Sequence, residues 1–181
     1  MSQIKCLLVI IITSKERREK MKKLQKIILL LVVFLLCGLS SVAKGADEQL
    51  GLVVDGSLLT DRQEVSTDTR SNARGTYLSY GSATLSNLGN HVVNMWGSTT
   101  CYKTSDQVKV TLSLQRLVNG SWTTIKTLNT KIAYNTNYVS KSQDVTVTGG
   151  YYYRIKGTHT AVKGKTVETT SSSTDGLWIS K

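Results

Sequence analysis

The chain has 181 residues, a formal net charge of +11, three cysteines and no proline. If an N-terminal export segment is lost, the remainder suits one domain with a real core and is too short for two well-stabilised ones. The charge is divided unevenly. Residues 1–43 carry eight Lys or Arg and two acids, so only +5 remains for residues 44–181. A residual charge of that size gives no reason to expect a nucleic-acid partner.

The N-terminal part has the pattern of a secretory signal peptide over residues 21–43. Met21 is followed by two lysines, and residues 27–36 form an apolar run before the small residues Ser41, Val42 and Ala43. That order of basic, apolar and small residues predicts cleavage after Ala43. The apolar run is shorter than the roughly 20 residues that span a bilayer, so membrane contact is expected only during export. The sequence thus predicts a secreted, extracellular protein.

Two segments flank the signal peptide without a clear pattern. Residues 1–20 hold a short apolar run and a charged block, and we interpret them as an upstream extension, with translation starting at Met21. Residues 44–75 are polar and acidic, in contrast to the basic residues that follow. They are expected to form a flexible lead or a removable pro-segment, in which residues 51–59 dock as an edge strand.

Residues 76–181 are predicted to form one all-β domain. Short alternating runs are expected to be strands over residues 77–85, 92–102, 108–117, 122–133, 138–148, 151–162, 166–172 and 177–180. Asn119-Gly120 is the strongest hairpin signal, because both central positions of a type I′ turn need a positive φ. Seven to eight antiparallel strands with frequent turns predict a β-sandwich of the immunoglobulin or fibronectin type III kind.

The run from Tyr151 to Gly157 makes that prediction more specific. Alternation places Tyr151, Tyr153 and Ile155 on one face and Tyr152 on the other. The run resembles the Tyr-x-Tyr-x-Val strand of fibronectin type III domains. The resemblance implies that a tyrosine hydroxyl makes a corner hydrogen bond.

Four motifs together resemble those of one family: Arg74-Gly75-Thr76-Tyr77-Leu78, Gly97-Ser98-Thr99-Thr100-Cys101, Asn119-Gly120-Ser121-Trp122 and Gly150-Tyr151-Tyr152-Tyr153-Arg154. The chain is similar over residues 50–179 to an uncharacterised family of small exported Gram-positive proteins, domain of unknown function 6147. The resemblance implies export and an all-β domain. It implies no activity.

Few residues offer catalytic chemistry. Cys101 is the single cysteine after residue 43, which excludes an internal disulfide in the exported chain. Cys101 and His159 could form a thiolate nucleophile if they met. Their alternation with apolar neighbours instead favours a buried thiol and a hydrogen-bonded histidine. The His, Cys and acidic residues have no metal-site spacing, and no cofactor is predicted.

The aromatic residues suggest a binding surface. Trp96 and Tyr152 have the opposite parity to their apolar neighbours, which would place both on a solvent-facing sheet surface beside Arg154 and Lys156. Exposed aromatic rings stack on sugar rings or contact surface polymers. A glycan or a surface protein is therefore the expected partner. The competing interpretation is that these amphipathic rings simply cover a polar sheet.

The sequence favours a secreted, non-enzymatic binding module that acts at the cell envelope or beyond it. A secreted antagonist of bacteriocin or toxin type is the alternative, because the exported chain is short and basic. A small hydrolase ranks third, with Cys101 or His159 as its expected centre.

Overall fold

The structure is a computed structural model that describes Gln25 and residues 49–69 and 75–181. These residues form an all-β protein, which confirms the predicted class. No helix in these ranges is long and apolar enough to cross a membrane. The expectations for the signal peptide, for the start at Met21 and for cleavage after Ala43 concern residues outside the described ranges.

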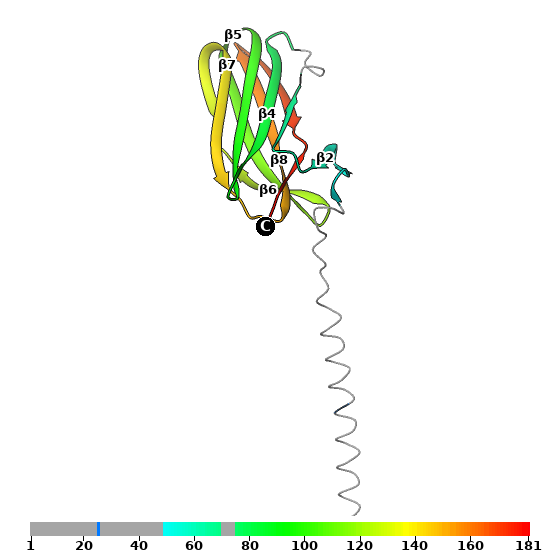
Figure 1. The fold of residues 1–181 in the computed structure, drawn as a ribbon. Helices are drawn as coiled ribbons and strands as arrows, with labels where there is room; N and C mark the ends of the chain where they lie inside the picture. The colour runs from blue at the N-terminus through cyan, green and yellow to red at the C-terminus, as the bar shows by residue number, and fades with distance from the viewer. Residues whose placement is uncertain (1–24, 26–48, 70–74) are drawn as a thin grey trace, which may run out of the picture. The chain divides into compact units, whose positions relative to one another are not determined.

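Ten strands make up one sheet (Figure 1). In chain order they are β1 (Val53–Val54), β2 (Ser57–Thr60), β3 (Glu64–Asp68), β4 (Leu78–Gly89), β5 (Val92–Val118), β6 (Ser121–Thr127), β7 (Lys131–Thr146), β8 (Tyr151–Lys163), β9 (Thr166–Ser173) and β10 (Gly176–Ile179). The count exceeds the predicted seven to eight. The sheet is also mixed, because β2 and β10 run parallel while the other pairs are antiparallel.

Strand β5 is the spine of the sheet. Its first part, up to Cys101, lies between β4 and β7. Its last part, from Gln107 onward, pairs with β8 on one edge, and with β7 and then β6 on the other. Since β4 and β8 lie one after the other along the same edge of β5, the sheet curls (Figure 1). The two strands predicted over residues 92–102 and 108–117 are thus one strand of 27 residues.

A bulge explains why the alternation along β5 looked like two strands. The pairing with β7 jumps from Thr100 to Ser105, which leaves residues 101–104 outside the regular register. Before the bulge the buried side chains have odd numbers, as at Val93 and Met95, and after it they have even numbers, as at Val108 and Val110. An insertion that shifts the inward parity leaves the chain extended.

The segment before residue 75 is part of the sheet. Strand β2 pairs with β10, whereas β3 pairs with β4, so the described part of this segment ties together two separate edges. Residues 49–69 and 75–181 belong to one compact unit. The strands within residues 53–68 therefore pair with the strands after residue 76, and β1 and β2 lie at one edge of the sheet. Removal of the segment as a pro-segment stays a prediction.

Glycine and asparagine set the hairpin turns where the pattern indicated them. Asn119 and Gly120 have φ values of +50° and +76°, and Val118 pairs with Ser121 across them, as a type I′ turn requires. The turn between β4 and β5 lies later than predicted, at Asn90 and His91.

The main core fills the concave side of the sheet. Its large members on β4, β5 and β8 include Leu85, Met95, Leu112 and Ile155. Tyr153 belongs to this core, and its hydroxyl donates a 2.6 Å hydrogen bond to the carbonyl oxygen of Thr148, five residues upstream. This bond confirms the corner hydrogen bond that the run of tyrosines suggested.

Candidate binding surface

The outward side chains of β7 and of the first part of β5 lie on the convex face of the sheet and include aromatic rings. We call Trp96, Tyr138 and Tyr134 the aromatic row. Directly paired residues of an antiparallel sheet share a face, so the register fixes the neighbours of each ring. Trp96 lies between Thr84 and Ser142. Tyr138 pairs with Thr100, and Tyr134 pairs with Gln107.

The two tyrosines are the open part of the row. Tyr138 is 46 % exposed and Tyr134 is 64 % exposed, whereas Trp96 is partly buried. Tyr134 and Tyr138 are four positions apart on one strand, which places them about 13 Å apart at 3.3 Å per residue. Tyr102, in the β5 bulge, is also 62 % exposed. Large rings in this number are unusual for a surface that contacts only water.

Short hydroxyl side chains fill the positions between the rings. The row between Trp96 and Tyr138 consists of Ser82, Ser98 and Ser140 on β4, β5 and β7, of which Ser82 and Ser140 are partly exposed and Ser98 is buried. Rings can stack on the apolar face of a sugar, and hydroxyls between them can exchange hydrogen bonds with its hydroxyl groups. The surface therefore has the chemistry to hold an extended chain of sugar rings.

Tyr152 does not belong to this surface, and its predicted exposure is wrong. Its side chain is 1 % exposed and packs with Leu59 and Leu117 in a second, smaller core. The ring of Trp178 lies against it, with 4.9 Å between the ring centroids. Parity correctly placed Tyr152 on the convex face, but β2 supplies the apolar cover there.

Arg154 is also buried, with 4 % exposure, and its guanidinium group contacts the hairpin of β1 and β2. Nη2 donates to the Asp55 carboxylate at 2.7 Å, and Nη1 donates to the Ser57 hydroxyl at 2.9 Å. Nε donates to the side-chain oxygen of Gln115 at 2.8 Å, and the Trp122 ring lies 4.6 Å from the guanidinium carbon. We call this group the Arg154 clasp.

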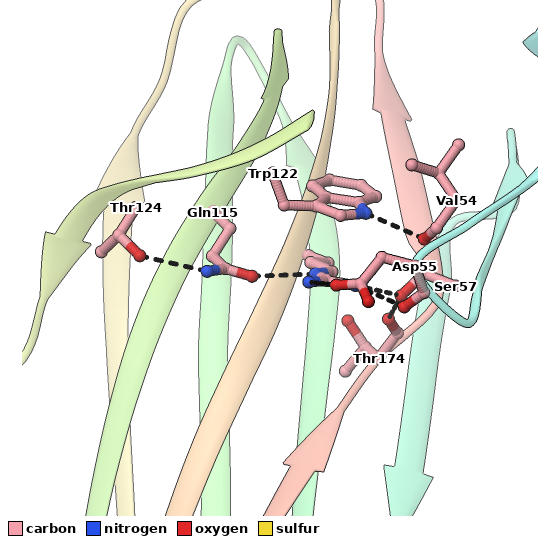
Figure 2. Close-up of polar contacts among 8 residues, drawn as sticks. Val54, Asp55, Ser57, Gln115, Trp122, Thr124 and Thr174 are labelled. Atoms are coloured by element: carbon pink, nitrogen blue, oxygen red, sulfur yellow. Dashed lines mark hydrogen bonds and ion pairs between the residues drawn. The ribbon is translucent and has the colours of Figure 1, made fainter. Parts of the chain in front are cut away.

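The Arg154 clasp holds the hairpin by more than one ion pair. The indole N–H of Trp122 donates to the carbonyl oxygen of Val54, and the Ser57 hydroxyl donates to that of Thr174 (Figure 2). The hydrogen bond and charge of Arg154 lower the pKa of Asp55. Arg154 thus has an internal partner for its charge. Of the four predicted ligand-binding residues, Trp96 stays on the aromatic row and Lys156 is exposed on β8.

Cys101 and His159 are both buried, at 4 % and 0 % exposure. Burial raises the pKa of the Cys101 thiol, which disfavours the thiolate. His159 lies where a side chain on Gly81 would overlap its ring, and hydroxyls of Thr99 and Ser172 contact its Nδ1 and Nε2 at 3.0 and 2.9 Å. Both ring nitrogens are therefore occupied by core hydroxyls.

The hydroxyl of Thr99 fixes the tautomer of His159. It donates its hydrogen to the carbonyl oxygen of Lys109 at 2.8 Å, so it must accept from Nδ1–H. Nε2 then accepts from Ser172. Burial lowers the pKa of His159 to about 4, which keeps the ring neutral. This histidine is built into the core as a polar link between β5, β8 and β9.

A family model matches residues 45–177, under the description family of unknown function (DUF6147). The chain belongs to this family. The match covers every described strand except the end of β10 and begins before β1, in agreement with a structural unit that includes the N-terminal hairpin. Among curated proteins, no match to the chain was found.

Sequence reasoning did not single out Tyr134 and Tyr138 of this DUF6147 chain. Both have even numbers on a strand whose buried residues, Val139 and Val145, have odd numbers. That parity was available in the sequence, but residues 131–137 were divided between a strand and a loop. Within the described ranges, no three His, Cys, Asp or Glu side chains are grouped so that they could hold a metal ion.

Proposed function

We propose that this DUF6147 protein is a secreted, non-enzymatic binding module that holds a glycan chain on the aromatic row. The observation that carries the proposal is the exposure of Tyr134 and Tyr138 on one face of β7, with hydroxyl side chains between the rings. A stiff, twisted sheet presents such rings with little loss of conformational entropy on binding.

Export and a sandwich-type fold belong to the same proposal. The signal pattern over residues 21–43 supports secretion from a Gram-positive cell. The hydrogen bond from Tyr153 to Thr148 supports a relationship to immunoglobulin or fibronectin type III sandwiches, in which a tyrosine corner recurs. In this interpretation, the two parts of the curled sheet correspond to the two layers of the sandwich.

Affinity electrophoresis of the purified protein through gels that contain soluble plant and bacterial glycans tests the binding. We expect at least one glycan to retard the protein. The double variant Tyr134→Ala/Tyr138→Ala should abolish the retardation, since each ring that stacks contributes about 1 kcal/mol or more to binding.

Leu88→Ala is the matched control, because Leu88 is 53 % exposed at the end of β4, outside the aromatic row. This variant should keep wild-type retardation, and circular dichroism should show all three proteins folded. Equal retardation of the wild type and the tyrosine double variant would contradict the proposal.

A further inference from the structure

We infer that the glycan bound by this protein is acidic, and that its anionic groups are attracted by Lys109, beside Tyr134, and by Lys156, farther along the sheet. The inference rests on the proposed function and adds the chemical class of the ligand. It follows from the partners of the charged side chains after residue 75: the acids have partners within the fold, and most of the lysine ammonium groups do not.

The four acids after residue 75 all have internal partners. Asp106 accepts from Lys163 Nζ and from the Gly164 N–H, and Asp144 accepts from the Asn94 amide. Asp175 accepts from the Leu58 N–H, and Glu168 accepts from the N–H groups of residues 76–78. Each of these carboxylates therefore accepts a hydrogen bond that stabilises a turn, a strand or a strand end.

Most lysines of the same region are not used in this way. Within residues 49–69 and 75–181, no side-chain hydrogen bond or ion pair is formed by the ammonium groups of Lys103, Lys109, Lys126, Lys131, Lys156 and Lys165. The charge of Lys156 acts on Asp55, which is already paired with Arg154, so the described strands keep an excess of positive charge. Such an excess attracts anionic partners over distances of about a Debye length.

The register places Lys109 next to the aromatic row and places Lys156 about 20 Å from Tyr134 along the direction of β5, at 3.3 Å per residue. Lys109 pairs with Ile132 of β7 and Thr160 of β8, and it lies diagonally beside Tyr134, which pairs with Gln107. On the same convex face, Lys156 pairs with Ser113. A path from Tyr134 across β5 to β8 therefore passes Lys109 before it reaches Lys156.

Hydroxyl groups surround both lysines. Thr111 pairs with Thr158, and Thr160 exchanges a hydrogen bond with Thr169 on β9. Ser113 likewise exchanges one with Thr127 on β6. A chain of sugar rings with carboxylate groups would meet an aromatic ring, hydroxyls and ammonium groups in turn. A neutral glycan would leave the two ammonium groups without a counter-charge.

Binding of polygalacturonate and of its fully methyl-esterified form to the purified protein, measured by isothermal titration calorimetry, tests the inference. The two polymers share a backbone and differ in charge. We expect binding of the acid form to be about tenfold tighter at low salt, and expect the difference to shrink in 0.5 M NaCl as screening increases.

The variant Lys109→Gln/Lys156→Gln should lose the preference for the acid form and keep any binding of the ester. Arg62→Gln removes one exposed charge elsewhere and should leave both affinities unchanged.

Equal affinity for the two polymers would overturn the inference but leave the proposed function intact. Loss of ester binding in Tyr134→Ala/Tyr138→Ala would then still support the aromatic row. Equal binding of polyglutamate would also overturn the inference, because the sugar would then play no part.

Discussion

Single buried polar residues explain much of the specificity of this core. His159 is fully buried, yet both ring nitrogens have hydroxyl partners, from Thr99 and Ser172. Glycines at positions 81 and 157 leave room for the imidazole, since an added Cβ would lie 2.0 Å and 2.7 Å from ring atoms. Burial nevertheless disfavours the charged ring, because the imidazolium would lose its hydration in the core.

This arrangement predicts a loss of stability in mild acid. The pKa of His159 is lowered by burial from 6.5 to about 4 in the folded chain, so between these values the unfolded chain binds the additional proton. Stability should fall as the pH drops through that window, by about 2 kcal/mol from pH 7 to pH 4.5. Urea unfolding at the two pH values measures the change.

His159→Gln is the matched variant, because glutamine stays neutral throughout this range. Its stability should be lower than that of the wild type at pH 7 but should vary much less between pH 7 and pH 4.5. The carboxylates with lowered pKa values, Asp106 and Glu168, lose their contribution only at more acidic pH. Equal pH dependence of the two proteins would contradict the assigned role of His159.

Among the elements, the hairpin of β1 and β2 is the one held mainly by side chains. Strand β1 has two residues and β2 has four, and β2 forms only two residue pairs with β10. The Arg154 clasp and the second core under Leu59 provide the remaining contacts. Such a short element would not stay in place by backbone pairing alone.

Arg154→Met should consequently destabilise the protein by about 2 to 3 kcal/mol, because several charged hydrogen bonds are lost while the buried volume is largely kept. Asp55→Asn should act in the same direction with a smaller effect, since Asp55 is exposed to water. Thermal unfolding measures both. Protease digestion should cut the hairpin of Arg154→Met first. A midpoint unchanged from the wild type would show that the Arg154 clasp is dispensable.

Over the whole molecule, residues 49–69 join two edges of one curled sheet. β2 extends the edge formed by β10, and β3 extends the edge formed by β4. Glu168 adds a separate link between β9 and β4: its carboxylate accepts from the N–H groups of Thr76, Tyr77 and Leu78, where β4 begins. Burial opposes ionisation of Glu168, but these three bonds outweigh it and lower its pKa.

Proteolytic cleavage during export should leave residues 49–69 attached to the protein. We expect the protein recovered from the medium of an expressing cell to begin at Lys44, because cleavage after Ala43 leaves every described strand in place. Removal up to residue 75 would expose Arg154, Tyr152 and two sheet edges, which favours aggregation. N-terminal sequencing and mass spectrometry measure the start. A folded, active protein that begins at residue 76 would contradict this expectation.

The sequence by itself determined the local features of this protein. Asn119-Gly120 predicted its turn, because few other residues adopt a positive φ at both positions. The alternation from Tyr151 to Gly157 also placed Tyr153 inside correctly. These features depend on backbone conformation and on a period of two, both of which are properties of neighbouring residues.

Only the tertiary structure decided which convex surface is covered and which is free. Parity assigns Tyr152 and Tyr138 alike to the outward side of their strands, but it carries no information about what lies over each strand. The second core under β2 buries Tyr152, although β2 lies more than 90 residues earlier in the chain, and no strand covers Tyr138 in the part that the structure describes. The candidate binding surface therefore includes tyrosines of β7, whereas the sequence had suggested Tyr152 of β8.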